Sequence, residues 1–287
     1  MDSRHVPVLA RQVIDGLALV PGATIFDGTL GLGGHAALVL AATSPNGTLV
    51  GFDKDARNLK EASRVLSGSV DRLVLVNDSF ANVAQHDIPR LNGALLDLGF
   101  SSVHVDDGAR GFSFMKDGPL DMRYDTRQEL TAAHIVNSWP RDDLATVFRL
   151  YGEDPYAHIV AKAITEARKK EKFTTTGQLA SLILSLAGGR RGKIHPATRV
   201  FQALRIAVND ELGELARGLD AITERLVPGG RIAVITFHSL EDRIVKQFFR
   251  DDPRLDVLTK RPIIATQTET IENPRSRSAK LRIAIKR

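Results

Sequence analysis

A glycine-rich segment near the amino terminus carries the first residues that could do chemistry. It reads Asp27-Gly-Thr-Leu-Gly-Leu-Gly-Gly-His35. Its turn glycines, Gly31, Gly33 and Gly34, allow a tight turn and a close approach of the backbone to a ligand. Asp53 ends the next apolar run, where a carboxylate can accept hydrogen bonds from both hydroxyls of a ribose. Together these residues predict a pocket for a nucleoside.

The glycine spacing alone leaves the kind of nucleoside open. The pattern Gly31-x-Gly33-x-x-Ala36 also fits the dinucleotide site of a nicotinamide-dependent reductase. The negative charge of Asp27 would repel a pyrophosphate, but it would attract the cationic amino group of S-adenosylmethionine. We therefore predict S-adenosylmethionine as the cofactor, with an NAD(P)-dependent reductase as the alternative.

A polar stretch that ends in an aromatic residue follows the third apolar run. It reads Asn77-Asp-Ser-Phe80. An adenine ring could stack on Phe80 and form hydrogen bonds with the polar side chains before it, which predicts the adenine end of the pocket. The alternative is that Asp78 caps a helix and Phe80 is a core ring.

Asp97 ends a fourth apolar run, and Ser101 and His104 follow it in one loop. A carboxylate at the carboxyl end of a central strand faces the crevice in which open α/β sheets bind ligands. We therefore expect Asp97 to lie beside the sulfonium and the incoming nucleophile, with helix capping as the alternative. Ser101 and His104 could contact the cofactor or the acceptor.

The elements that must position these residues alternate in the first third of the chain. Four short, largely apolar runs predict buried strands at residues 23–27, 49–53, 73–76 and 93–97. Apolar residues at helical spacing lie between them, at residues 38–42 and 57–66. This alternation predicts a parallel, doubly wound α/β sheet of the Rossmann-like type.

The pattern becomes helical after about residue 106, which indicates an inserted all-helical module. Helices are predicted at residues 144–151, 156–167 and 179–186, and a long helix from 197 to 226. Strands then resume at 231–237, 255–258 and 281–286, with a polar loop from 266 to 280. We assign residues 1–106 and 205–287 to the cofactor-binding domain and residues 107–204 to the inserted, substrate-recognition domain.

Composition is that of a globular protein with a sizeable core, because 43% of the 287 residues are hydrophobic. The sequence holds no cysteine, which excludes disulfides and thiolate metal sites and fits a reducing cytoplasm. No stretch approaches the roughly 18 apolar residues of a membrane span, and the first residues lack the layout of a signal peptide. The eight histidines show no metal-ligand spacing. We expect a soluble, cytoplasmic protein without a metal.

Positive charge is concentrated in two parts of the chain. The net charge is +5, and residues 107–204 carry 15 Lys and Arg against 11 Asp and Glu, while residues 251–287 carry 9 against 5. Tight basic clusters occur at Arg168–Lys172 and Gly189–Lys193. Such clusters favour a surface that meets phosphates, although a solvated face is the alternative.

Several segments, taken in order, resemble one protein family almost from end to end. The chain resembles the RsmH (MraW) family, N4-methyltransferases that act on a cytidine of small-subunit ribosomal RNA. The matching segments are His5–Leu9, Asp27–His35, Asp97–Ser102, Arg110–Arg123, Pro196–Glu211, Phe237–Arg243 and Asn273–Ser278.

The resemblance implies a set of cofactor-site residues, an inserted helical module and an acceptor. The implied cofactor-site residues are Gly33, Gly34, His35, Asp53, Phe80, Asp97 and His104. Some members have a glutamine where this chain has His104, and either side chain can form hydrogen bonds. The implied acceptor is cytidine C1402 of 16S ribosomal RNA in the 30S subunit, and a homodimer stays open as the assembly of the protein.

The exocyclic amine of cytosine is a poor nucleophile because its lone pair is delocalised into the ring. Asp97 is the candidate acceptor that pulls on its N–H.

His238 follows a later apolar run and could orient the base or cap a helix, so we count Asp97, Ser101 and His238 as candidate catalytic residues. A base taken out of folded RNA also needs an aromatic wall, for which Trp139 is the candidate beside Phe112 and Phe114, unless these rings are core of the inserted module.

Arg275 and Arg277 alternate with serines in the polar loop near the carboxyl terminus. Guanidinium groups suit phosphate, so we expect both arginines to bind the RNA backbone together with the basic clusters. A non-catalytic RNA-binding factor of ribosome assembly would keep these surfaces and is the second alternative function.

Overall fold

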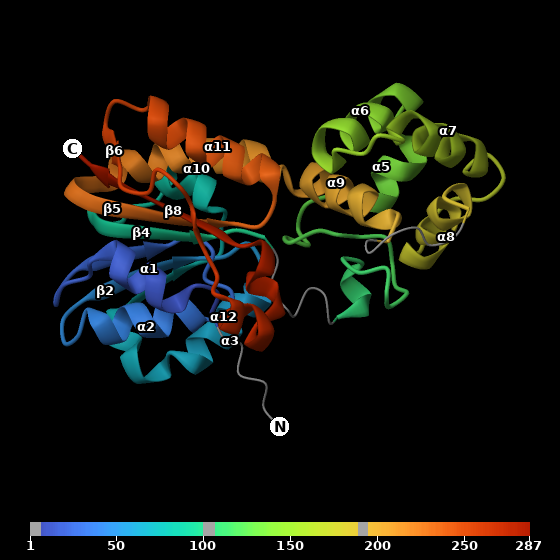
Figure 1. Ribbon diagram of the computed structural model, residues 1–287. Helices are drawn as coiled ribbons and strands as arrows, with labels where there is room; N and C mark the ends of the chain where they lie inside the picture. Colours follow the sequence, from blue (N-terminus) through green and yellow to red (C-terminus); the bar gives the residue numbers. More distant parts are fainter. Residues whose placement is uncertain (1–6, 100–106, 189–194) are drawn as a thin grey trace. The chain divides into compact units, whose positions relative to one another are not determined.

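The computed structural model describes residues 7–99, 107–188 and 195–287. The chain forms two compact units, one made of Met1–Gly99 with Leu212–Arg287 and the other of Phe100–Glu211 (Figure 1). The predicted inserted module, residues 107–204, falls within the second unit, which extends further at both ends. The predicted border after residue 204 lies inside the helix Ala197–Asn209, the second unit ends at Glu211, and the domain assignment stays a prediction.

An eight-stranded sheet forms the centre of the first unit. Its strands run in the order β3-β2-β1-β4-β5-β8-β6, and β7 pairs with β8. All neighbouring pairs from β3 to β5 are parallel, while β8 is antiparallel to its neighbours. The prediction of a Rossmann-like sheet is therefore confirmed. The strands are β1 (Thr24–Asp27), β2 (Thr48–Phe52), β3 (Leu73–Val76), β4 (Leu91–Asp97), β5 (Leu226–Thr236), β6 (Leu255–Val257), β7 (Ile263–Ile264) and β8 (Lys280–Lys286).

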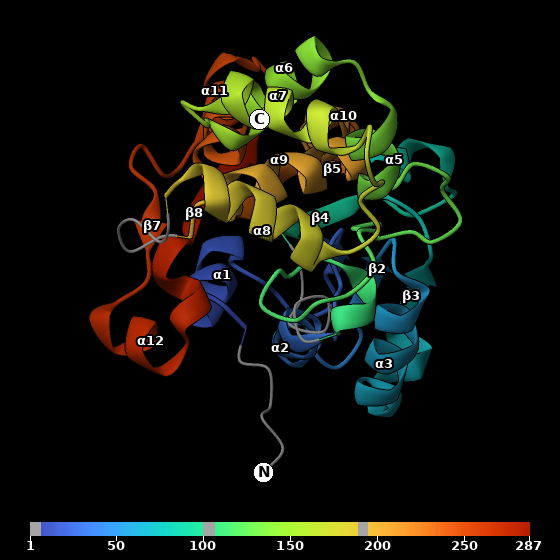
Figure 2. The same cartoon turned by 90° about the vertical axis from the view of Figure 1, so that its right-hand side faces the viewer.

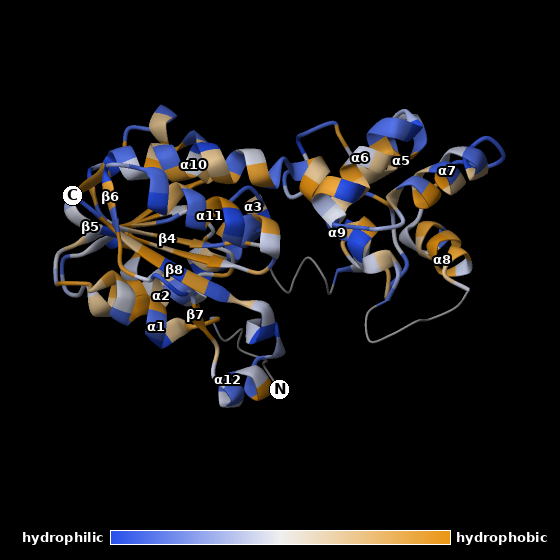
Figure 3. Ribbon diagram, turned by 45° about the horizontal axis from the view of Figure 1, so that its top comes forward, coloured by the Kyte–Doolittle hydropathy of each residue, from blue (hydrophilic) through white to orange (hydrophobic). Residues whose placement is uncertain are grey.

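Helices cover both faces of this sheet, as expected for buried parallel strands. Helices α10 and α11 lie over one face and α1 and α2 over the other, and Figure 3 shows the strands as a hydrophobic layer between them. The helices and short 3-10 turns of the first unit are α1 (Ala10–Leu17), α2 (Gly34–Ala42), α3 (Ala56–Val65), η1 (Ser67–Arg72), η2 (Phe80–Gln85), α10 (Glu211–Arg225, which starts at the border), α11 (Ser239–Asp251), α12 (Gln267–Glu272) and η4 (Pro274–Ser278).

The second unit is helical, with its own apolar core. Leu144, Phe148, Leu179 and Leu204 are among its fully buried side chains, and they come from three different helices. Burial of each such side chain contributes about 1.5 to 3 kcal/mol to the stability of the fold, and this contribution makes the helices pack together. Its elements are η3 (Gly108–Arg110), α5 (Ala132–Ser138), α6 (Arg141–Gly152), α7 (Ala157–Ala167), α8 (Thr176–Leu186) and α9 (Ala197–Asn209).

The long helix predicted from residue 197 to 226 was wrong, because the structure has two helices there. Asp210 adopts a left-handed conformation with φ of 49° and ends α9. The amide of Asn209 donates to the carbonyls of Met122 and Arg205, and its oxygen accepts from the backbone of Tyr124. These tertiary hydrogen bonds hold the break, and the apolar periodicity of the sequence cannot reveal them.

Two further local predictions needed correction. The polar loop expected at residues 266–280 contains α12 and η4, and β5 begins at Leu226, before rather than after the Pro-Gly-Gly sequence. Among the residues that the structure describes, we find no helix with both the length and the apolar composition needed to cross a bilayer.

Candidate active site

The glycine turn after β1 has a backbone conformation that suits glycine. Gly31 and Gly33 have positive φ angles of 54° and 84°, a region that residues with a Cβ rarely adopt. Gly33 is the N-cap of α2, and Gly34 is the first residue of that helix. A Cβ on Gly33 would lie 3.3 Å from the side chain of Leu66. The turn therefore presents bare backbone at the amino end of α2.

Asp53 follows β2 and is held by several donors at once. One carboxylate oxygen accepts from the backbone N–H of Gly31 and the other from that of Asp55, both at 2.8 Å. The amide of Asn58 reaches both oxygens at 3.2 Å, and Asn77 donates to the Asp53 carbonyl at 2.9 Å. Sequence reasoning did not name Asn58, and it gave Asn77 only as part of the polar stretch before Phe80. The carboxylate is thus rigidly placed, and ribose hydroxyls would share oxygens that already accept from the protein.

Asp27 is almost completely buried at the end of β1. Its Oδ1 accepts from the backbone N–H of Thr29 at 3.1 Å. Burial raises the pKa of Asp27 to about 7, although the charge of His35 and the Thr29 hydrogen bond lower it in part, and the nearby Asp97 and Asp53 raise it further. The Asp27 carboxyl group, for which the sequence predicted a negative charge, therefore titrates near neutral pH.

Asp97, at the end of β4, faces His35 on the first turn of α2. The Nε2 atom of His35 lies 3.5 Å from Oδ2 of Asp97. The other oxygen, Oδ1, is buried and has no hydrogen-bond partner among the described residues. Burial lowers the pKa of His35, but Asp97, Asp27 and the backbone of Val8 outweigh this effect, so the pKa is raised. The structure thus brings the two predicted acids and the predicted histidine into one cluster.

Phe80 lies in the core of the first unit, with 9% of its surface exposed. A Cβ on Gly218 of α10 would meet its ring at 2.3 Å, so the ring fills a space that only glycine leaves open. Asp78 does not cap the next turn, because Ser79 does so. Burial raises the pKa of Asp78, but hydrogen bonds from His86, Asn82 and Ser79 outweigh it, so the pKa is lowered. Stacking of adenine on Phe80 stays a prediction.

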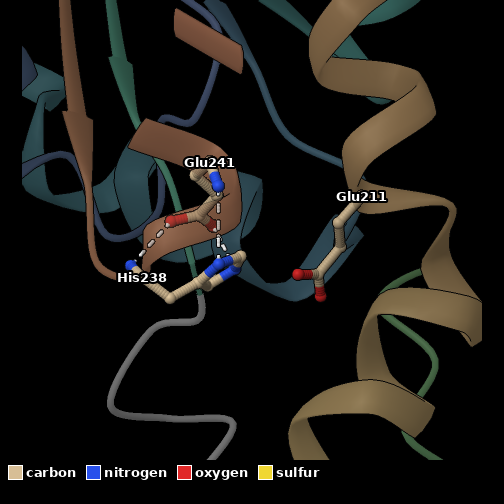
Figure 4. A group of neighbouring side chains, drawn as sticks. All are labelled: Glu211, His238 and Glu241. Carbon is tan, nitrogen blue, oxygen red and sulfur yellow. Dashed lines mark hydrogen bonds and ion pairs between the residues drawn. The ribbon is translucent and has the colours of Figure 1, made fainter. Parts of the chain in front are cut away.

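His238 is the N-cap of α11, directly after β5. Its Nδ1 accepts from the backbone N–H of Glu241 at 3.5 Å, and Glu241 in turn accepts from the backbone N–H of His238 at 3.3 Å (Figure 4). The Nε2 atom also lies 3.1 Å from a carboxylate oxygen of Glu241, which is itself buried. This geometry is the capping role that the sequence left open. The three-residue spacing of His238 and Glu241 could have revealed the pair.

The aromatic candidates Phe112, Phe114 and Trp139 are partly buried and pack against the core of the second unit. Phe112 stacks on Tyr124 with ring centroids 5.2 Å apart, and Phe114 stacks on His195 at 4.6 Å. Trp139 is the C-cap residue of α5. The expectation that these rings serve the module core is therefore met in the structure, and a role for Trp139 toward a base stays a prediction.

The arginines of the carboxyl-terminal turn are exposed. Arg275 and Arg277 belong to η4, and Ser276 between them is buried and donates to the carbonyl of Asn273 at 2.8 Å. The turn leads into Lys280, which pairs with Thr236 at the end of β5. Both arginines therefore come shortly before β8, which begins at the edge of the sheet where Asp27 and Asp97 lie.

Three predicted features fall outside the described residues. They are Ser101, His104 and the basic cluster Gly189–Lys193. Their roles are left as the sequence predicts them.

The acids and the glycine turn occupy the point at which open α/β sheets bind ligands. β1 lies between β2 and β4, so the chain leaves β1 for one side of the sheet and reaches β4 on the other. Asp27 and Asp97 end these neighbouring strands. Ligands of such sheets bind in the crevice at this change of direction. Fold and site together define a Rossmann-like α/β protein of the class I methyltransferase type.

Comparison with known proteins places the chain more narrowly. A model of the MraW methylase family matches residues 2–287, so the chain belongs to that family. The resemblance seen in the sequence is therefore confirmed.

Two relatives and one solved structure match nearly the whole length of the chain. A protein of Syntrophotalea carbinolica is 46% identical over 99% of this chain and 98% of its own length, and one of Nostoc sp. is 49% identical over 98% and 92%. Both are named ribosomal RNA small subunit methyltransferase H. The crystal structure of a provisionally named rRNA-methylase from Clostridium thermocellum is 14% identical, with a TM-score of 0.51 over 99% of this chain and all of that one, which bears on the fold alone.

Proposed function

We propose that this chain transfers a methyl group from S-adenosylmethionine to the exocyclic N4 amine of a cytidine in 16S ribosomal RNA. The specific acceptor is C1402 of the 30S subunit, as the family resemblance implies. Membership of the MraW methylase family and the names of its relatives support the reaction and the class of RNA. The observation that carries the proposal is the placement of Asp27 and Asp97 at the ends of neighbouring strands, beside the glycine turn.

The residues of the pocket fit S-adenosylmethionine better than a dinucleotide. Asp27 and Asp97 are acids near the turn, and the Oδ1 atom of Asp97 is a buried acceptor without a partner among the described residues. Such acceptors attract a cationic amino group and repel a pyrophosphate. When bound, S-adenosylmethionine supplies an electrophilic methyl group. This fit disfavours the NAD(P)-dependent reductase.

Asp97 has the chemistry that an attacking amine requires. As nitrogen forms its bond to the methyl carbon and the carbon–sulfur bond breaks, the amine must lose a proton. A carboxylate that accepts the N–H makes the nitrogen more nucleophilic before this happens. Rigid placement of the acid by the end of β4 adds to the effect, since good positioning can contribute roughly 7 to 11 kcal/mol.

The second unit is proposed to recognise the RNA. Lys169, Lys170 and Lys172 are exposed after α7, as phosphate contacts require. Trp139 is the proposed stacking partner of the extruded base, because the rings of Phe112 and Phe114 are already stacked on neighbours. Arg275 and Arg277 of the first unit are proposed to add contacts to the backbone.

A methyl-transfer assay tests the proposal. Purified 30S particles that lack the modification are incubated with radiolabelled S-adenosylmethionine and the protein, and the labelled nucleoside is identified by mass spectrometry. We expect N4-methylcytidine at one position, and a loss of at least about 100-fold in rate for Asp97→Asn. Equal labelling by the variant would refute the role of Asp97. Binding of NADH but not of S-adenosylmethionine to the wild-type protein would refute the function itself.

A further inference from the structure

Two buried ionisable side chains and a half-buried one meet at the carboxyl edge of the sheet. Asp27 and His35 have 1% and 6% of their surface exposed, and the Asp97 side chain has 22%. They come from the end of β1, the first turn of α2 and the end of β4. Two carboxylates in such surroundings destabilise the fold unless a positive charge or several donors face them.

The carboxylates of the site differ in the hydrogen-bond donors that face them. Asp53 accepts from backbone and side-chain donors on both oxygens. Among the described residues, no backbone or side-chain amide donates to the Asp97 carboxylate, but the Nε2 atom of the His35 imidazole lies 3.5 Å from its Oδ2. Both ring nitrogens of His35 are buried and form no hydrogen bond of good geometry within the described residues, although Asp97 and the backbone of Val8 lie near the ring. The imidazole is therefore the group available to balance the charge of Asp97.

We propose that His35 is a positioning residue. Its protonated ring lies between Asp27 and Asp97 and keeps Asp97 ionised. It also leaves the Oδ1 atom of Asp97 facing the ligand. This inference rests on the proposed function, because it assigns Asp97 its role in that reaction. The imidazolium would face Oδ2 only, so one oxygen stays an acceptor for the N–H of the attacking amine. His35 touches no reacting atom in this account.

The charges around the ring agree with this assignment. Asp97 from β4 and Asp27 from β1 face His35, and the backbone of Val8, just before α1, faces it as well. These groups raise the pKa of His35 despite its burial, while Asp53 acts only on Asp27. The pKa of His35 is thus raised by the two carboxylates that face it, and the pKa of Asp27 is raised to about 7 by its burial. The net charge of the cluster becomes more negative as the pH rises, which favours a cationic ligand.

Removal of the imidazole has a specific consequence. Without its counter-charge, Asp97 would become a weaker acid and would be protonated at a higher pH. A protonated carboxyl cannot accept the N–H with the same strength. The acid limb of the rate profile should therefore move upward in His35→Gln, with the rate restored at alkaline pH. A merely structural role for His35 would lower the rate equally at every pH.

The charge state can be measured on the protein alone by NMR titration of the imidazole resonances. The His35 signal is assigned by its loss in His35→Gln, and the exposed His158 serves as the reference. We expect His35 to stay protonated well above the midpoint of His158, and Asp97→Asn to lower the His35 midpoint by about one pH unit or more. A His35 midpoint at or below that of His158, or one that Asp97→Asn leaves unchanged, would overturn the proposal. Should His35→Gln fail to fold, the loss of the signal in His35→Asn makes the assignment instead.

The kinetic test uses single-turnover methyl transfer between pH 5 and 9. We expect the acid limb of His35→Gln to shift upward by about one pH unit, and that of His158→Gln to match the wild type. A uniform loss without a shift would overturn the positioning role. If the wild-type protein transfers no methyl group, the proposed function fails, and the NMR midpoint still decides the charge of His35.

Discussion

The backbone N–H of Asp97 donates a hydrogen bond of 2.6 Å to the side-chain hydroxyl of Thr29. The two residues lie 68 positions apart in the chain, at the ends of β4 and β1. Thr29 also donates its own backbone N–H to Asp27. One threonine thus fixes both acids of the site relative to each other.

Thr29→Val should therefore impair both stability and catalysis. The variant keeps the shape of the side chain but leaves the N–H of Asp97 without its acceptor, at a cost of about 1 to 3 kcal/mol. We expect a rate of methyl transfer lowered by roughly 10-fold or more, measured in single turnover. Thr29→Ser keeps the hydroxyl and should retain most of the rate. Equal losses in the two variants would contradict this account.

The stability of the protein should depend on the charge of Asp27. Its pKa is raised from 3.8 to about 7 by burial, so the folded state binds a proton that the unfolded state has already lost between these values. Stability must then fall as the pH rises from about 4 to 7. In Asp27→Asn this contribution is absent, because the amide stays neutral while its oxygen can still accept from Thr29.

Urea unfolding at pH 5 and at pH 8 measures this difference. The free energy of unfolding of Asp27→Asn, taken relative to that of the wild type, should be higher at pH 8 than at pH 5 by on the order of 2 to 4 kcal/mol. A constant difference at both pH values would show that Asp27 is ionised with an ordinary pKa. His35 also has a raised pKa and acts in the same direction, but it is present in both proteins.

The basic cluster after α7 should divide into residues that bind RNA and one that supports the fold. Arg168 donates to the carbonyl of Val136 at 2.8 Å, whereas Lys169, Lys170 and Lys172 are exposed. Replacement of the three lysines by alanine should weaken binding to any RNA sequence and lower the salt slope by about three.

Arg168→Ala is the matched control for that variant. It should reduce stability by about 1 kcal/mol, because it removes a hydrogen bond to the end of α5, and should change the salt slope by less than the lysine variant. Filter-binding titrations at several salt concentrations give the slope. A salt slope that changes equally in both variants would contradict the division.

Glu269 should stabilise the start of α1 from the far end of the chain. Its Oε1 accepts from the backbone N–H of Leu9 at 2.7 Å, and α12 lies beside α1 in both Figure 1 and Figure 2. Leu9 is the N-cap of α1 and offers no side-chain cap. Glu269→Ala should cost about 1 kcal/mol and increase hydrogen exchange in α1.

Glu269→Gln keeps an oxygen acceptor at the same position and should lose less stability than the alanine variant. Both are compared by urea unfolding and by amide exchange. Unchanged exchange in α1 for Glu269→Ala would show that the contact contributes nothing to the helix.

The sequence by itself determined the alternation of the first four strands with the helices between them in the first unit. Short apolar runs that end in Asp27 and Asp97 predict parallel strands, and the carboxyl ends of parallel strands share one edge of a sheet. The glycine turn and Asp53 followed from the same local reasoning, because the conformational need of Gly31 and Gly33 is a property of the backbone itself. The contacts of Asn58 and Asn77 with Asp53 were missed because they form in three dimensions.

Only the tertiary structure decided what each side chain faces. Periodicity could not show that α9 ends at Asp210 or that the Phe80 ring fills the space above Gly218, and the sequence left the capping role of His238 as one of two alternatives. It also could not show that Asp27 is buried deeply enough to titrate near pH 7 beside His35. Burial and charge pairing depend on residues far apart in the chain, whereas strand and turn propensities depend on near neighbours. For this reason the location of the site follows from local sequence, and its electrostatics follow from the fold.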